Sequence, residues 1–221
     1  RDSAVSRGLG DVYKRQLFRR GPLTMAPSQF GIFTKSDKRF DTPNIEFHIQ
    51  PLSLDSFGKP LHKFPGLTVS VCNLRPLSRG TVSLSSSNPF DKPKIAPNYL
   101  SDYEDQQVAV ESILKARELM ATNEMAVFEP EEFLPGKNFV KPEELVQEAG
   151  KISTTIFHPV GTAKMGSYDD PMAVVNEKLK VRGFKNLRVV DGSVMPVITS
   201  GNTHTPIVMI AEKASEMILN D

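Results

Sequence analysis

Three short runs with the composition of β-strands follow one another between residues 44 and 84, with turns and loops but no helical pattern between them. The first run, 44–50, alternates apolar and polar residues like a half-buried strand and ends at Pro51. The runs 68–74 and 79–84 are equally short. Parallel strands need a crossover of about a dozen residues or more, usually a helix, so this spacing predicts antiparallel pairing.

Helical patterns follow these strands. A helix is expected from Ser101–Glu104, which has the spacing of a capping box, to about residue 120, because apolar residues recur there every three or four positions. A second helix is expected over 142–150, with proline at its start and glycine at its end, after a loop over 123–140. The last helix is expected over 206–219. The predicted fold class is α+β, a mainly antiparallel sheet with covering helices.

Shorter extended segments are expected between the second and the last helix. Val174-Val175, 179–181 and 187–190 have the composition of short strands, and Gly183 suits a turn between the last two. Residues 17–41 contain several glycines and prolines and are expected to be irregular.

The composition limits the class of protein. The 221 residues are 39% hydrophobic and 24% charged, as in an ordinary globular protein, and no apolar run is long enough for a membrane span. A net charge of +1 gives no reason to expect nucleic acid as a partner. Four scattered histidines and one cysteine lack the spacing of a zinc site, so no metal is expected.

The single cysteine, Cys72, lies in an apolar run. This setting favours a buried structural thiol over a reactive nucleophile. One cysteine cannot form an internal disulfide, which fits a reducing compartment, and a cytoplasmic location is expected.

The first 16 residues do not match the rest of the chain. Asp11–Gln16 resembles the translation of a sequencing-library adaptor read through into a gene, and residues 1–16 show neither apolar periodicity nor helix caps. They are expected to be a disordered, adaptor-derived segment, with a disordered basic leader as the alternative. Residues 17–29 are then an irregular lead-in, and the chain is expected to be a fragment of a longer protein.

A polar cluster interrupts the apolar last third of the chain at residues 158–162, His-Pro-Val-Gly-Thr. Proline and glycine fix this turn, so the His158 imidazole is held on a rigid backbone. Imidazole is the side chain best suited to accept a proton near neutral pH. On this motif alone, a core histidine with satisfied hydrogen bonds is the alternative.

A second polar cluster, Ser200–Pro206, precedes the last helix. Asn202 suits a helix cap there. A helix start also presents unpaired N–H groups and a partial positive charge, which stabilise negative charge on a bound group. His204 is either a second polar group at this place or a turn residue. Asp191 and Gly192 close the preceding strand-like run, and ligands of open α/β sheets bind beyond strand ends of this kind.

Together, the segments 158–166, 187–196 and 200–214 closely resemble, in order and spacing, the C-terminal segment of the glucose–methanol–choline oxidoreductases. Leu74–Gly80 also resembles the family's segment that leads into a strand of the substrate domain. The resemblance covers roughly residues 22–221.

The resemblance implies how the chain divides. Residues 30–169 correspond to the substrate-binding domain, and residues 170–221 return a strand and a helix to the FAD-binding domain. The family's Gly-x-Gly-x-x-Gly loop, which receives the FAD pyrophosphate, occurs nowhere in the 221 residues. We therefore expect a fragment that lacks the N-terminal half of the FAD-binding domain and is inactive on its own.

The resemblance also implies an activity and a site. In this family FAD accepts a hydride from a small-molecule alcohol, which becomes a carbonyl. His158 corresponds to the base for the hydroxyl proton, and Asn202 to the residue that hydrogen-bonds the substrate oxygen. Thr203 and His204 fall where backbone N–H groups meet the pyrimidine edge of the flavin.

Asp191 and Gly192 correspond to positions near the ribityl and phosphate groups of FAD. The resemblance leaves open which alcohol is oxidised and which acceptor reoxidises the flavin. Two other functions are alternatives: a non-catalytic remnant that acts as a binding domain, and a hydrolase that uses His158. Against the hydrolase, the sequence contains no Gly-x-Ser-x-Gly nucleophile elbow.

Overall fold

The computed structural model of the chain describes residues 4–24, 26, 28–56 and 58–221. They form two compact units, one made of Arg1–Phe33 and Phe47–Val71 and the other of Thr34–Glu46 and Cys72–Asp221. Both polar clusters found in the sequence lie in the second, larger unit.

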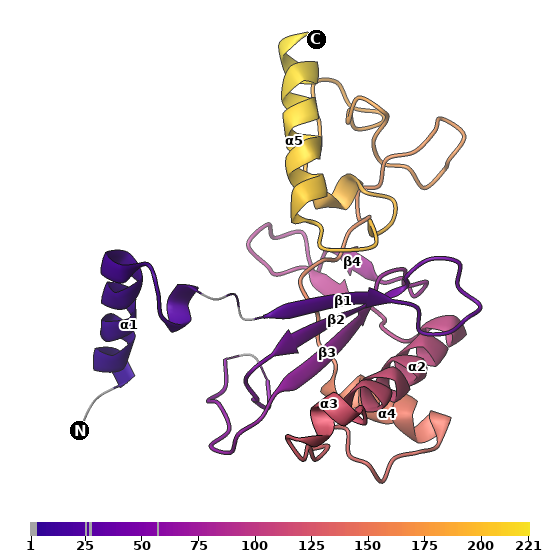
Figure 1. Ribbon diagram of the computed structural model, residues 1–221. Helices are drawn as coiled ribbons and strands as arrows, with labels where there is room; N and C mark the ends of the chain where they lie inside the picture. The colour runs from indigo at the N-terminus through magenta and orange to yellow at the C-terminus, as the bar shows by residue number, and fades with distance from the viewer. Residues whose placement is uncertain (1–3, 25, 27, 57) are drawn as a thin grey trace. The chain divides into compact units, whose positions relative to one another are not determined.

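Three strands form one sheet in the order β1-β2-β3 (Figure 1). They are β1 (Phe30–Thr34), β2 (Ile45–Gln50) and β3 (Thr68–Asn73). The Gln29 N–H donates to the Ile49 carbonyl at 2.8 Å and the Asn44 N–H to the Thr34 carbonyl at 3.1 Å, so β1 and β2 run antiparallel. Strands were correctly predicted at β2 and β3. The prediction of irregular structure is wrong for β1, because its hydrogen bonds come from a partner strand that the local sequence does not reveal.

The first half of β2 is covered on both faces. Ile45, Glu46 and Phe47 are all buried, although their alternation predicts a strand with one solvated face. Cys72 in β3 is partly buried, as expected of a structural thiol. Burial raises the pKa of the Cys72 thiol to about 11, with a smaller contribution from the negative charge of Glu46. A thiol with this pKa is a poor nucleophile at neutral pH.

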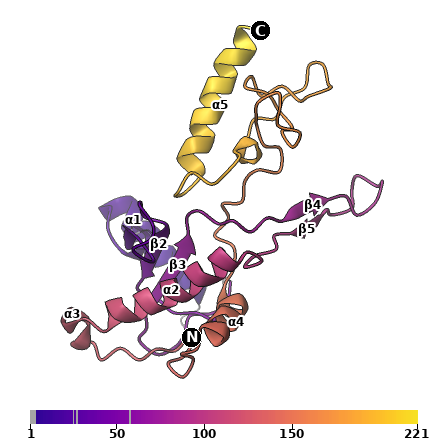
Figure 2. The ribbon, with the colours of Figure 1, turned by 90° about the vertical axis from the view of Figure 1, so that its right-hand side faces the viewer.

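A two-stranded hairpin holds the third predicted strand. β4 (Thr81–Ser83) pairs antiparallel with β5 (Lys94–Ala96), and Figure 2 shows the two side by side. A Cβ on Gly80 would lie 2.3 Å from the Ala96 carbonyl oxygen, so glycine is required where the two segments approach. β5 was not predicted, because its short run lies between two prolines.

The two long helices of this part of the chain lie side by side in both views (Figures 1 and 2). They are α2 (Tyr103–Met120) and α4 (Pro142–Ile152), and a short helix, α3 (Asn123–Ala126), lies in the expected loop. The cap of α2 is Asp102, one residue later than predicted, and its carboxylate accepts the Glu104 N–H at 2.9 Å. α4 continues two residues beyond Gly150, since a glycine costs a helix only about 1 kcal/mol.

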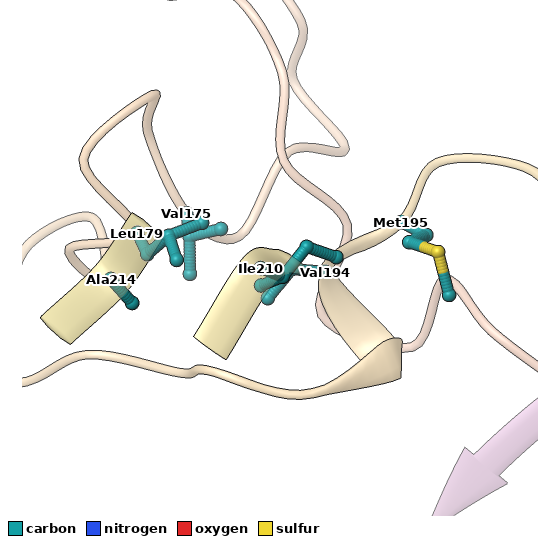
Figure 3. Close-up of a cluster of buried hydrophobic side chains, with 6 residues drawn as sticks. All are labelled: Val175, Leu179, Val194, Met195, Ile210 and Ala214. Atoms are coloured by element: carbon teal, nitrogen blue, oxygen red, sulfur yellow. The ribbon is translucent and has the colours of Figure 1, made fainter. Parts of the chain in front are cut away.

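The C-terminal segment has its own apolar core. Figure 3 shows the buried side chains of this core, which come from α5 (His204–Leu219), from the 3-10 helix η2 (Gly192–Val194), from the residue after η2 and from the loops before it. The members are Val175, Leu179, Val194, Met195, Ile210 and Ala214. Within the described ranges, no helix combines the length and the apolar character needed to span a membrane.

The short strands predicted before η2 are wrong. Residues 174–190 form only isolated bridges, which pair Val175 with Met165 and Val181, and Lys180 with Arg188. The backbone takes positive φ angles at Leu179 (60°), Gly183 (78°) and Asn186 (57°), and these residues interrupt any extended run. The fold is thus α+β with small antiparallel sheets and helices, and in the described chain Asp191 follows an extended segment rather than a strand.

Residues near the N-terminus differ from the expectation of disorder. Ala4–Phe18 forms helix α1, and Pro22–Thr24 forms the 3-10 helix η1; residues 1–3 lie outside the described part of the chain. No proline interrupts α1, and Lys14 and Asp11 pair one turn apart at 3.8 Å. Its apolar Tyr13, Leu17 and Phe18 are exposed.

Asp105 is a buried carboxylate that holds the turn after β3. It accepts the Asn73 side-chain amide at 3.1 Å and the backbone N–H groups of Leu77 at 2.9 Å and Ser78 at 2.7 Å. We predict that Asp105→Ala lowers the free energy of unfolding by about 3 kcal/mol, because these donors lose their acceptor. Urea denaturation measures the change. The exposed Asp169→Ala is the control, expected within about 0.5 kcal/mol of the wild type; equal midpoints for the two variants would contradict the role of Asp105.

Candidate functional site

His158 lies on a turn whose backbone is fixed on both sides. Phe157, just before it, has a φ of 65°, which is rare for a side chain of this size, and Gly161, just after it, has a φ of 89°. Beyond the turn, the Ala163 N–H donates to the Ser193 carbonyl at 3.0 Å and the Met165 N–H to the Val194 carbonyl at 2.8 Å. The segment that carries His158 is therefore attached to η2 by these two backbone hydrogen bonds, a contact that the sequence did not predict.

The second polar cluster leads directly into α5. Ser200 has a φ of 59°, and Thr203 is the N-cap residue of the helix. The Ile207 N–H donates to the Thr203 carbonyl at 3.1 Å, and Thr203 itself is only 3% exposed. The position of Thr203 is thus set by the helix, whose Ile210 and Ala214 belong to the apolar core.

The structure brings these two clusters together. The Nδ1 atom of His158 lies 2.9 Å from Oγ1 of Thr203, and the Nε2 atom lies 3.0 Å from Nδ2 of Asn202. Both ring nitrogens of a half-buried imidazole are therefore engaged by consecutive residues of the other cluster. Asn202 is exposed, so the Nε2 side of the ring is the side that a ligand can reach.

One placement of the imidazole proton satisfies both contacts of His158. An amide nitrogen only donates hydrogen bonds, so Nδ2 of Asn202 donates to Nε2 of His158. A neutral imidazole whose Nε2 accepts has its proton on Nδ1, and Nδ1–H then donates to the hydroxyl of Thr203. The arrangement presents a basic nitrogen next to an amide donor, which suits a ligand that gives a proton and keeps a partial negative charge.

The start of α5 has no side-chain cap. The sequence offered Asn202 as a possible cap, but its side chain contacts His158 instead. The hydroxyl of the N-cap residue, Thr203, also contacts His158 and makes no capping hydrogen bond. His204, the first residue of the helix, is exposed. An uncapped helix start offers backbone N–H groups and a partial positive charge to an acceptor.

Asp191 and Gly192 take structural places beside this group. The Asp191 carboxylate accepts the Ser193 N–H at 2.8 Å and caps η2, and its side chain is exposed. A Cβ on Gly192 would lie 3.0 Å from Cδ1 of Ile207, so glycine lets η2 approach α5 closely. No hydrogen bond between described residues joins either of them to His158.

The side chain of Thr203 is the part of the group that the sequence did not indicate. The family resemblance implies only a backbone role for Thr203, and the hydroxyl of a threonine before a helix is ordinarily expected to cap that helix. A signal is nonetheless present: Pro206 is the third residue of α5 and has no N–H, so one of the usual partners of a capping hydroxyl is missing.

Comparisons with known proteins cover the part of the chain that contains His158 and Asn202. The family model described as GMC oxidoreductase matches residues 76–211, more than half of the chain. An "Alcohol dehydrogenase [acceptor]" of Pseudomonas putida is 41% identical over 98% of this chain and 39% of its own length. An "Oxygen-dependent choline dehydrogenase" of Vibrio vulnificus is 41% identical over 85% of this chain and 34% of its own length.

A solved structure is also similar to this chain. The crystal structure of pyridoxine 4-oxidase from Mesorbium loti superposes with a TM-score of 0.79 at 27% identity and covers 88% of this chain and 38% of that one. The chain therefore spans well under half the length of the proteins it matches.

We predict that neutral His158 carries its proton on Nδ1. In the protein labelled with ¹⁵N-histidine, the Nδ1 resonance is expected to show a directly bound proton and the Nε2 resonance an unprotonated nitrogen, because Nε2 accepts from Asn202. A His158→Gln spectrum assigns the two signals. A neutral ring protonated on Nε2 would contradict the described hydrogen bonds.

Proposed function

The chain belongs to the GMC oxidoreductase family, and from this premise we propose that the whole protein oxidises the CH–OH group of an alcohol to a carbonyl. The observation that carries the proposal is the contact of 3.0 Å between Nε2 of His158 and Nδ2 of Asn202. They contact each other in this structure, and an alcohol that displaces this contact meets one acceptor and one donor at the accessible side of the imidazole. An alcohol hydroxyl, which is both a donor and an acceptor, is the complementary group.

His158 and Asn202 have different proposed roles toward the hydroxyl group of the alcohol. In the proposed complex the alcohol O–H donates to Nε2 of His158, and Nδ2 of Asn202 donates to the alcohol oxygen. His158 then takes the hydroxyl proton as the general base and becomes an imidazolium, with Nδ1–H still directed at Thr203. Asn202 stabilises the negative charge that develops on the oxygen and does not itself titrate.

The chain's residues fit FAD at one place in particular. The uncapped start of α5, with the backbone N–H groups of Thr203 and His204, suits the electron-rich edge of a flavin ring. We propose Asp191 and Gly192 near the ribityl and phosphate part of the cofactor. When bound, FAD supplies the acceptor for the hydride that leaves the carbinol carbon as the carbonyl forms.

The proposal includes a division of the chain. Residues 30–169 would belong to the substrate-binding domain and residues 170–221 to the FAD-binding domain. Support for the second part is the apolar core of α5 and η2, whose buried members all lie at or after Val175, although Val160 and Met165 of the preceding segment pack against it. The pairing of His158 with Asn202 then joins a residue of the substrate domain to a residue of the cofactor domain.

The proposed base is tested by His158→Ala in the whole protein. The rate of flavin reduction by an alcohol without oxygen should fall about 10²- to 10⁴-fold, because proton abstraction loses its general base. Stopped-flow absorbance of the flavin measures this rate. Bound flavin should be retained, which separates loss of the base from loss of the cofactor. Flavin reduction at the wild-type rate in this variant would refute the assignment.

A further expectation concerns the 221-residue chain by itself. It contains no Gly-x-Gly-x-x-Gly loop and spans 39% of the length of the Pseudomonas putida relative, so it lacks the usual receptor for the FAD pyrophosphate. We predict that the purified chain shows no flavin absorbance and does not oxidise alcohols. A yellow chain with stoichiometric FAD after gel filtration would show that the C-terminal residues suffice for binding.

A further inference from the structure

We infer that Thr203 is a positioning residue: its hydroxyl oxygen holds His158 in the tautomer that places the lone pair on Nε2. The inference rests on the proposed function, in which Nε2 is the atom that accepts the proton. It assigns to the Thr203 side chain a role distinct from that of its backbone N–H. The contact that carries it is the 2.9 Å distance between Thr203 Oγ1 and His158 Nδ1.

The oxygen of Thr203 is fixed more firmly than that of an ordinary loop residue. Thr203 is 3% exposed, and its carbonyl accepts the Ile207 N–H in the first turn of α5. A β-branched side chain has few accessible χ1 rotamers on a fixed backbone. The hydroxyl is therefore presented at a set place, where it defines the orientation of the imidazole ring.

The Thr203 hydroxyl is available to His158 because it makes no capping hydrogen bond with the backbone of α5. An N-cap hydroxyl ordinarily accepts the N–H of the second or third helical residue. In α5 the third residue is Pro206, which has no N–H, and Thr203 makes no side-chain capping bond. The same threonine thus leaves the start of α5 open and supplies the acceptor for Nδ1–H.

Loss of this oxygen should redistribute the imidazole proton. Without an acceptor at Nδ1, the tautomer with its proton on Nε2 becomes competitive. In that tautomer Nε2 has no lone pair for an alcohol proton, and its N–H faces the amide donor of Asn202. Groups that orient an imidazole through its second nitrogen contribute about 10- to 100-fold at metal sites, and a neutral hydroxyl belongs at the lower end of that range.

The experiment uses the whole protein with Thr203→Val, which removes the oxygen and keeps the shape of the side chain. Thr203→Val should reduce its flavin with an alcohol about 10-fold more slowly than the wild type. Its ¹⁵N-histidine spectrum should show His158 as a mixture of tautomers. Thr203→Ser retains the hydroxyl and should restore both the rate and the single tautomer. Thr205→Val, an exposed change two residues along α5, is the matched control and should alter neither.

Thr203→Val with a wild-type rate of flavin reduction would overturn the inference, and so would a slow variant whose tautomer is unchanged. Bound flavin absorbance and the thermal midpoint show whether the variant is folded; Thr203→Ala removes the same oxygen and serves if the valine is not tolerated. Failure of the proposed function gives a different result, since His158→Ala would then reduce flavin as fast as the wild type. The tautomer of Thr203→Val would still decide whether Thr203 positions the ring.

Discussion

The packing of α5 against η2 and the loops before it is the constraint on which the site depends. Ile210 and Ala214 of the helix are buried with Val175 and Val194, and Gly192 has no side chain where Ile207 approaches. This core fixes the start of α5, and with it Asn202 and Thr203. The segment of His158 is fastened to the same η2 through Ala163 and Met165. Two stretches some forty residues apart in sequence are thereby held within hydrogen-bonding distance.

The chemistry follows from the kinds of atoms that this packing brings together. One ring nitrogen of His158 contacts a neutral hydroxyl and the other contacts a neutral amide. Neither of these two partners is a charged carboxylate. A base of this kind gains a positive charge when it takes a proton, and in the proposed complex that charge lies beside the developing negative charge on the substrate oxygen. Attraction between the two is strongest where water is excluded. The uncapped start of α5 adds a partial positive charge at the place proposed for the flavin.

Local patterns in the sequence predicted the elements that local interactions determine. The helices α2, α4 and α5 show apolar periodicity, α2 has a side-chain cap at Asp102, and α4 and α5 have a proline in their first turn. The alternating run of β2 was recognisable in isolation. β1 and β5 were missed because their hydrogen bonds come from partner strands. The strand predicted at 179–181 was wrong because Leu179 adopts a positive φ angle, which is rare for leucine and is not indicated by the local sequence.

In the site, too, some residues are indicated by sequence motifs and others only by tertiary contacts. His158 and Asn202 could be named as partners only through the order and spacing of three motifs, and their contact at 3.0 Å agrees with that pairing. The role of the Thr203 hydroxyl depends on a tertiary contact with a residue 45 positions away. Pro206 signals only that one capping partner is missing, and it does not indicate His158 as the partner.

The most direct test of the central claim is a crystal structure of the whole protein with a bound, unreactive alcohol analogue. We expect the hydroxyl oxygen of the analogue to lie about 2.6–3.2 Å from both Nε2 of His158 and Nδ2 of Asn202. An analogue whose hydroxyl contacts neither atom, with both side chains in place, would contradict the account.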